Sequence, residues 1–195
     1  INRIGDFVMR RAFAEGARWP DLKIAVNVSP VQLSDPDFVR KTADIVKASG
    51  MHPSRAIIEI TEGFFISNPE RARVSISEIR RIGMKVSLDD FGSGFSSVGY
   101  LRQFGFDRIK LDRSLVEGVG ESGRAVEMLR ATVALARSLD MPVTAEGVES
   151  EAQAVALRLA GCDLLQGFLF GKPLGADRID QLRRGGPLLQ LPNIA

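Results

Sequence analysis

The sequence is poor in the residues that carry disulfide, soft-metal or membrane chemistry. It has one cysteine, Cys162, and one histidine, His52, in 195 residues. A single cysteine excludes an intrachain disulfide and favours a reducing compartment, so we expect a cytoplasmic protein. No apolar run approaches the roughly 20 residues of a membrane span, and no signal peptide is visible. The net charge of +2 gives no argument for a nucleic-acid polymer or a membrane surface as partner.

What the chain does have is a regular alternation of β-branched apolar runs with amphipathic helical stretches. The expected strands are 23–29, 56–62, 85–89, 108–112, 142–147 and 164–170. This alternation predicts a parallel sheet with helical crossovers in a single domain over 1–195. Six strands fit an α/β fold of the (β/α)8 TIM-barrel type without its first strands, and an open doubly wound sheet is the alternative. Because the chain begins inside an apparent helix, we expect the domain to be N-terminally incomplete.

Each expected strand carries a polar residue near its C-terminal end, on the face opposite its large aliphatic side chains. Side chains alternate along a strand with a period of two. The polar residues on this face are Asn27, Glu59, Asp89, Lys110, Glu146 and Gln166. In a parallel barrel this face lines the interior, and the C-terminal ends of the strands form the catalytic mouth. We therefore expect these side chains to meet at one rim.

The predicted rim holds many more acidic than basic groups, since Lys110 and Arg113 are its only cations. The carboxylates belong to Glu59, Glu62, Asp89, Asp90, Asp112, Glu146 and Glu149. Such a cluster without counter-ions would raise several pKa values and cost stability. Carboxylates with Asn27 form a hard, oxygen-rich site that favours Mg²⁺ or Mn²⁺, with Ca²⁺ as a non-native, inhibitory ion. Zinc is disfavoured because His52 lies in a helix-to-strand loop, at the opposite end of the barrel.

The segment KVSLDDFGSGFSS (85–97) places two adjacent aspartates where a strand ends. Asp89 and Asp90 repel each other, but such a pair can splay around two divalent cations, as in sites for in-line displacement at phosphorus. The loop that follows, with Gly92, Ser93 and Gly94, lacks the Gly-Lys-Ser/Thr ending of a P-loop. Its glycines predict a mobile lid or a close backbone approach to substrate, and an ordinary strand-to-helix turn is the alternative.

Six segments together resemble the EAL-type cyclic di-GMP phosphodiesterase domain. They are NVSPVQL, EITE, DDFGSGFSSVGYL, IKLD, AEGVES and QGFLFGKPL, from residue 1 to about 173. The resemblance implies a (β/α)8 barrel that hydrolyses cyclic di-GMP to linear pGpG in bacterial second-messenger signalling. It also implies a homodimer through the region after Asp90, and further signalling domains, such as GGDEF or sensory domains, in the parent protein.

The resemblance further implies a set of two metal ions. Asn27, Glu59 and Asp89 resemble ligands of the first ion. Asp89 would bridge to the second ion, which Asp90 and Glu146 would complete.

Other roles are also implied by the resemblance. Lys110 resembles the residue that contacts the attacking water. Glu146 is either a metal ligand or a general base. Gln166 resembles a residue that holds metal-bound water, and Glu62 resembles the glutamate that tethers the glycine-rich lid.

The Glu-Ala-Leu signature itself is absent from the chain. In the family it lies on an early strand and supplies a ligand of the first metal, so we expect it upstream in the parent protein. We also expect these 195 residues alone to fold poorly or to fill the gap with another chain. A catalytically degenerate domain that serves as a cyclic di-GMP receptor or interaction module is the alternative. An unrelated metal-dependent barrel enzyme for another phosphate ester or a sugar is a third hypothesis.

Overall fold

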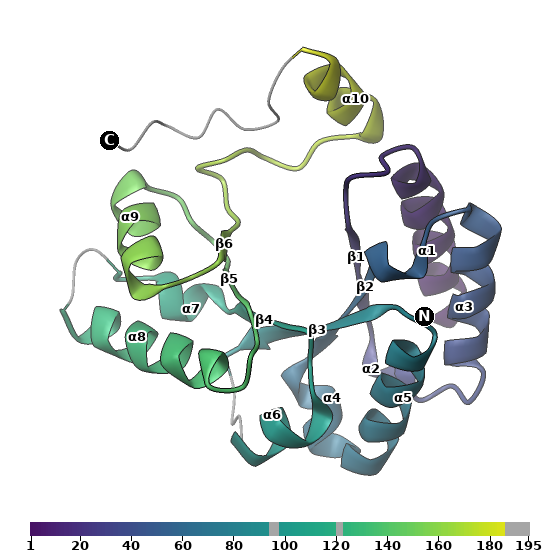
Figure 1. Cartoon of the computed structure of the whole chain (residues 1–195), viewed down its shortest axis with the longest axis horizontal. Helices are drawn as coiled ribbons and strands as arrows, with labels where there is room; N and C mark the ends of the chain where they lie inside the picture. The colour runs from purple at the N-terminus through teal and green to yellow at the C-terminus, as the bar shows by residue number, and fades with distance from the viewer. Residues whose placement is uncertain (94–97, 120–122, 186–195) are drawn as a thin grey trace.

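The computed structural model describes residues 1–93, 98–119 and 123–185, and within them six parallel strands carry helices on their outer side (Figure 1). The strands are β1 (Ile24–Val28), β2 (Ala56–Thr61), β3 (Lys85–Phe91), β4 (Arg108–Leu111), β5 (Val143–Ala145) and β6 (Leu164–Leu165). The α-helices are α1 (Asn2–Ala17), α2 (Pro30–Leu33), α3 (Phe38–Ser49), α4 (Glu62–Ser67), α5 (Pro69–Arg81), α6 (Val98–Phe104), α7 (Arg113–Val116), α8 (Gly123–Arg137), α9 (Glu151–Ala160) and α10 (Ala176–Arg184). A short 3₁₀ helix, η1 (Pro53–Arg55), precedes β2.

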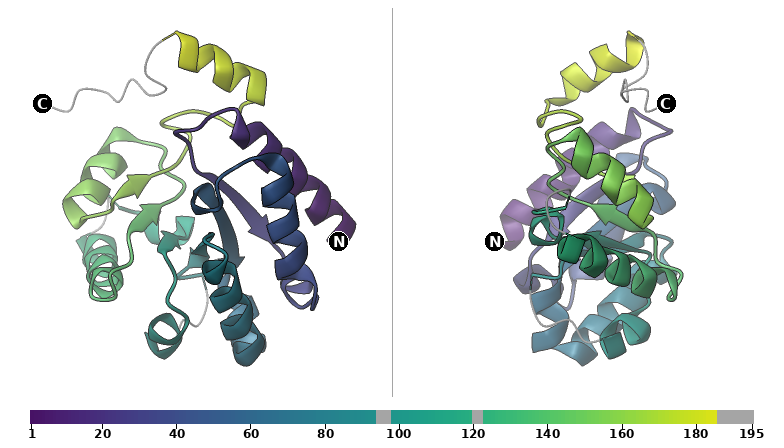
Figure 2. Two further views of the ribbon diagram at one scale, coloured as in Figure 1. Left: turned by 45° about the vertical axis from the view of Figure 1, so that its right-hand side comes forward. Right: turned by 90° about the vertical axis from the view of Figure 1, so that its left-hand side faces the viewer.

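The strands follow one another in the sheet in chain order, from β1 to β6, and every neighbouring pair is parallel. They form an arc with β1 and β6 at its edges and the helices outside it (Figures 1 and 2). A doubly wound sheet reverses its strand order at a switch point, and this sheet does not. The prediction of consecutive strands of a TIM-type barrel is therefore confirmed, and the doubly wound alternative is excluded.

The outer face of the central strands consists of apolar side chains that are buried against the helices. They include Ile58, Ile60, Val86, Leu88, Ile109, Leu111 and Val143, each fully buried. The inner face is buried too in the middle of the arc, but there it is polar, since Glu59, Ser87 and Lys110 are all less than 9% exposed. At the β1 edge the same face is open, and Asn27 is exposed. This alternation matches the period-two pattern of the sequence.

The helix α10 connects the β6 side of the arc back to the segment that follows α1. Trp19 donates a hydrogen bond from Nε1 to Asp180 Oδ1 at 2.6 Å. Arg18 also forms an ion pair with Asp180, and Arg183 pairs with Asp21 at 2.5 Å. Figure 1 shows α10 beside the opening between β6 and β1. Within the described residues, no helix combines the length and apolar character needed to span a membrane.

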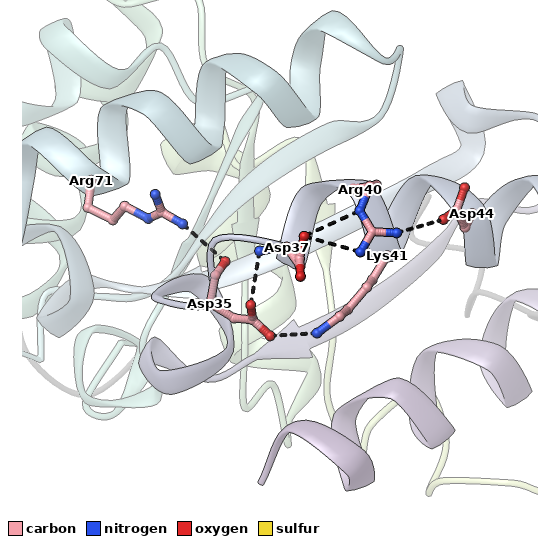
Figure 3. A network of polar contacts seen from close by, with 6 residues as sticks. All are labelled: Asp35, Asp37, Arg40, Lys41, Asp44 and Arg71. Carbon is pink, nitrogen blue, oxygen red and sulfur yellow. Dashed lines mark hydrogen bonds and ion pairs between the residues drawn. The ribbon is translucent and has the colours of Figure 1, made fainter.

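A polar network fixes the path of the chain after β1 (Figure 3). In the turn between α2 and α3, the carboxylate of Asp35 accepts hydrogen bonds from Lys41 Nζ at 2.8 Å and from the backbone N–H of Asp37 at 2.9 Å. Arg71 of α5 donates to the carbonyl oxygen of Asp35 at 3.0 Å. The hydrogen bond with Lys41 lowers the pKa of Asp35. The turn is thereby attached to α5, which follows β2 in the sequence.

Several strand ends differ from the predicted limits. β6 covers two residues rather than the expected 164–170, because among the described strands it pairs with β5 alone and its regular ladder ends at Leu165. Glu62, expected at the end of a strand, is instead the first residue of α4. β3 runs two residues further than expected, to Phe91, past an irregularity in its register with β4. This irregularity shapes the site described next.

Candidate functional site

The centre of the site is Lys110, whose ammonium group lies among three carboxylates. Its Nζ is 3.0 Å from Glu59 Oε2, 2.9 Å from Asp89 Oδ1 and 2.8 Å from Glu146 Oε1. Burial alone would lower the pKa of Lys110, but the hydrogen bond to Glu146 and the charges of Glu59 and Asp89 outweigh it and raise that pKa. Residues from β2, β3, β4 and the end of β5 thus meet, as the strand-end pattern predicted.

Asp90 joins this cluster because its backbone leaves the extended conformation. Its φ of 55° is in the left-handed region, which aspartate tolerates better than most residues. In a regular strand, adjacent side chains point to opposite faces. The change at Asp90, within the register irregularity between Leu88 and Phe91, lets the carboxylates of Asp89 and Asp90 serve one site.

The described start of the glycine-rich loop forms a tight turn against Asp90. Ser93 donates to the carbonyl oxygen of Asp90 from its Oγ at 2.8 Å and from its backbone N–H at 3.2 Å. Gly92 has a φ of 98°, a conformation that favours glycine, and a Cβ there would collide with Leu115. Gly94 lies outside the described residues, so the lid prediction stays a prediction.

The donor set fits a hard divalent cation. One oxygen from each of Asp89, Asp90 and Glu146 lies within 4.8 Å of the others. Burial raises the pKa of Glu59 despite the attraction of Lys110. Burial also raises the pKa of Asp90, with the charges of Asp89 and Asp112 adding to the effect. One ammonium group does not neutralise four carboxylates, and a cation with oxygen ligands at this position would supply the missing charge.

Asn27 faces the same acidic centre from the neighbouring strand. It pairs in register with Glu59, so both side chains point to the inner face. A pocket of about 550 Å³ is lined by Asn27, Asp89 and Asp90, together with residues of α1 and α2. A second pocket, of about 340 Å³, lies on the other side of Asp90 and is lined also by Glu146, Gln166 and Phe168. The Asp90 side chain therefore borders two cavities, and both open at the carboxyl ends of the strands.

Not all of the acidic residues counted in the sequence join the cluster. Asp112 accepts a hydrogen bond from the backbone N–H of Ser114 at 3.0 Å and caps α7. Hydrogen bonding with the Ser114 side chain, and to a lesser extent with its backbone, lowers the pKa of Asp112. Glu149 forms an ion pair with Arg113 at 3.0 Å, and Arg113 also contacts Glu117. These local partners explain why the central cluster is smaller than the sequence count.

The two remaining sequence-predicted residues lie at the edges of the site. Glu62 is 4% exposed at the start of α4, and its two carboxylate oxygens have no hydrogen-bond partner among the described residues. Its predicted contact with the lid stays untested because residues 94–97 are outside the description. Gln166 is exposed, immediately follows β6 and lines the pocket that contains Glu146.

The opposite end of the sheet carries a different kind of pocket. It measures about 480 Å³ and is lined mainly by apolar residues, among them Val46, Met51 and Met84. His52 lies at this end, in the expected helix-to-strand connection, where it is exposed and contacts Ser54. Cys162 is free and buried, and burial raises the pKa of its thiol to about 11. The lining of this apolar pocket contains no carboxylate.

Two inner-face hydroxyls were not singled out from the sequence. Ser87 and Thr144 are buried in the same face as Asp89 and Glu146, and neither hydroxyl has a hydrogen-bond partner within the described part of the chain. Small hydroxyl residues inside strands are common, so only their burial draws attention to them. A polar group that lacks a partner in a buried position requires an explanation.

Sequence comparison shows which family the chain resembles. The profile of the EAL domain matches residues 1–173. A signalling protein of Caulobacter vibrioides is 41% identical over 187 residues, which cover 95% of this chain and 23% of that protein. The bifunctional diguanylate cyclase/cyclic di-GMP phosphodiesterase MucR of Pseudomonas aeruginosa is 33% identical over 92% of this chain and 27% of its own length. The chain thus spans about a quarter of the length of these relatives.

Solved structures agree with the sequence comparison. The MucR phosphodiesterase in complex with c-di-GMP has a TM-score of 0.86 and 32% identity, covering 91% of this chain and 74% of that one. The EAL domain of Mycobacterium smegmatis DcpA has a TM-score of 0.88 and 35% identity, with 93% and 84% coverage. Klebsiella pneumoniae BlrP1 in a manganese and c-di-GMP complex has a TM-score of 0.82 and 33% identity, with 88% and 44% coverage. With its parallel strands in chain order and its acidic centre, this chain belongs to the EAL domain family.

Proposed function

We propose that the domain containing this chain hydrolyses cyclic di-GMP to linear pGpG in a reaction that depends on Mg²⁺ or Mn²⁺. The observation that carries the proposal is the convergence of Asp89, Asp90 and Glu146, whose ligand oxygens lie within 4.8 Å of one another. A catalytically inactive receptor has no need to keep these carboxylates around a buried lysine. The relative MucR, named as a cyclic di-GMP phosphodiesterase, and its c-di-GMP complex support the choice of substrate.

Different residues of the chain would bind the two cations. Asp89, Asp90 and Glu146 would hold one cation, and Asn27, Glu59 and Asp89 would hold another. When bound, such cations polarise the phosphodiester and lower the pKa of water. The pocket on each side of Asp90 offers space beside the acidic centre for the two halves of a cyclic dinucleotide.

Lys110 supplies a permanent positive charge at the point where negative charge develops during phosphodiester hydrolysis. Its ammonium group is buried at the acidic centre, where it contacts three carboxylates from other strands or strand ends, and a fixed charge at this position can stabilise the transition state. Glu146 is less buried than Lys110 and lines a pocket, so its carboxylate can also accept a proton from a water molecule there.

The test is a hydrolysis assay with cyclic di-GMP in Mg²⁺ or Mn²⁺, with the product identified by mass spectrometry. The intact protein should produce pGpG, and EDTA should abolish the product. Asp89→Asn and Glu146→Gln should each reduce kcat by at least about 100-fold, because each removes a charge that acts on the transition state.

The matched control is Glu127→Gln, which removes an exposed carboxylate on α8 that pairs with Arg130 at 3.4 Å. It should leave kcat unchanged. Tight binding of cyclic di-GMP by the intact protein without any turnover, in either metal, would contradict the enzymatic proposal and favour a receptor.

A further inference from the structure

Two buried hydroxyl groups lie on the inner face of the sheet, one step below the acidic centre. Ser87 precedes Asp89 by two residues on β3, and Thr144 precedes Glu146 by two residues at β5. With the period of two along a strand, each hydroxyl shares a face with the carboxylate above it. Ser87 is fully buried and Thr144 is 5% exposed, yet Ser87 Oγ and Thr144 Oγ1 have no hydrogen-bond partner among the described residues. Both are therefore acceptors available to a buried donor.

In the register of the sheet, Lys110 lies beside Thr144 and one step above Ser87. Thr144 is its register partner on β5, and Ser87 pairs with Arg108, which is two residues before Lys110 on β4. Neighbouring strands are about 4.8 Å apart. A lysine ammonium on a flexible four-carbon stem can therefore reach Thr144 directly and Ser87 directly or through one water molecule.

The present partners of Lys110 are also the oxygens that a divalent cation would need. Its three contacts, to Glu59, Asp89 and Glu146, match the three donors of an ammonium group. Asp89 and Glu146 belong to the cluster that fits a cation. A cation and the ammonium group then compete for the same carboxylates, and a buried ammonium group that loses acceptors must find others.

We propose that Ser87 and Thr144 are positioning residues that accept hydrogen bonds from Lys110 when a divalent cation takes over its carboxylate partners. Lys110 is then the counter-ion of the metal-free site, and the two hydroxyls hold its ammonium group in the loaded site. This inference rests on the proposed function only in requiring that a divalent cation binds at the acidic cluster. It makes no assumption about turnover.

Metal affinity provides the first measurement. Titration calorimetry of the full chain with Mn²⁺ and Mg²⁺ should show about tenfold weaker binding for Ser87→Ala/Thr144→Val than for the native chain, the effect of losing a hydrogen bond to a charged group. Thr144→Ser, which keeps the hydroxyl, should bind the metal as the native chain does.

Stability of the metal-free protein separates positioning from a structural role. Because neither hydroxyl has a partner among the described residues, Ser87→Ala/Thr144→Val should unfold in EDTA at the same temperature as the native chain or at a higher one. A merely structural role predicts a lower unfolding temperature in EDTA.

A double-mutant cycle tests whether the hydroxyls act through Lys110. Lys110→Met removes the competing cation and should tighten metal binding. In the Lys110→Met background the two hydroxyl substitutions should have no further effect on affinity. Two results would overturn this inference while leaving the proposed hydrolysis intact. One is a tenfold loss of metal affinity from the hydroxyl substitutions in the Lys110→Met background as well. The other is no loss of metal affinity when the hydroxyl substitutions are made in the native chain. A native chain that binds neither metal would overturn both the inference and the proposed hydrolysis.

Discussion

At the scale of single residues, the two adjacent aspartates act together only because Asp90 leaves the strand conformation. Its φ of 55° within the register irregularity of β3 turns its carboxylate toward the site that Asp89 already faces. Ser93 stabilises this conformation with two hydrogen bonds to the carbonyl oxygen of Asp90. The sequence shows two like charges side by side, whereas the backbone conformation explains how both serve one site.

Substitutions at Asp90 should separate its charge from its backbone conformation. Asn tolerates the left-handed region, so Asp90→Asn should keep the unfolding free energy and weaken metal binding. Asp90→Val should weaken metal binding and also lower the unfolding free energy by roughly 1–2 kcal/mol, because a β-branched residue is strained there. Urea denaturation in EDTA and metal titration measure the two effects.

Asp140 provides the matched control, since it is the other non-glycine residue with a positive φ in the described ranges, at 56°. It follows α8, in the connection to β5, far along the chain from the acidic cluster. Asp140→Val should lower the unfolding free energy to a similar extent with no change in metal affinity. Equal stability of Asp90→Asn and Asp90→Val would contradict the role of the left-handed conformation.

At the scale of elements, two capping boxes fix the chain where it leaves strands that carry site residues. After β1, Ser29 Oγ accepts from the N–H of Gln32, whose side chain accepts from the N–H of Ser29. After β5, Ser150 and Gln153 make the same reciprocal contacts at the start of α9. Each box holds a short connection close to a site residue, Asn27 or Glu146.

Removal of the second capping box should cost stability. Ser150→Ala removes the acceptor for the Gln153 N–H and should lower the unfolding free energy by about 1 kcal/mol. Urea denaturation followed by far-UV circular dichroism measures the change. Ser138→Ala, which removes an exposed hydroxyl that donates to the Leu135 carbonyl, is the control and should change the unfolding free energy by less than about 0.5 kcal/mol. Similar losses for both variants would argue against a special role for the cap.

The sequence predicted much of the fold and of the site, and what it missed follows from tertiary geometry. The polar residues at the strand ends predicted that Glu59, Asp89, Lys110 and Glu146 would meet, because parallel strands end at one edge. The sequence could not show that Asp112 and Glu149 interact with nearby residues instead of the acidic centre, since the same residues are compatible with both arrangements. The short β6 was also missed, because the length of this strand depends on pairing with neighbouring strands, and among the described strands β6 pairs with β5 alone.

At the scale of the whole molecule, α10 joins the far end of the chain to the segment after α1. The contact centres on Trp19, the single tryptophan of the chain, which is 6% exposed. Its indole N–H donates to Asp180, which also pairs with Arg18. The tryptophan therefore reports on whether α10 is docked.

Loss of this contact should be visible in fluorescence. Asp180→Ala removes the acceptor of the Trp19 indole, so its emission should shift to longer wavelength and acrylamide should quench it more strongly. Asp177→Ala, in the first turn of the same helix and exposed, should leave both properties unchanged. Unchanged emission in Asp180→Ala, with native circular dichroism, would contradict docking of α10 through this residue.

The position of Lys110 has a mechanical consequence for the sheet. Its ammonium group connects β4 to Glu59 on β2, and β3 lies between these strands in the sheet order. An ion pair between β4 and β2 on the concave side of the sheet holds these two strands together across β3 and limits how far the sheet can flatten. The curvature of the sheet thus depends on a positive charge at its centre. If the lysine and the metal were both removed, repulsion between the carboxylates would widen the arc and move these carboxylates apart.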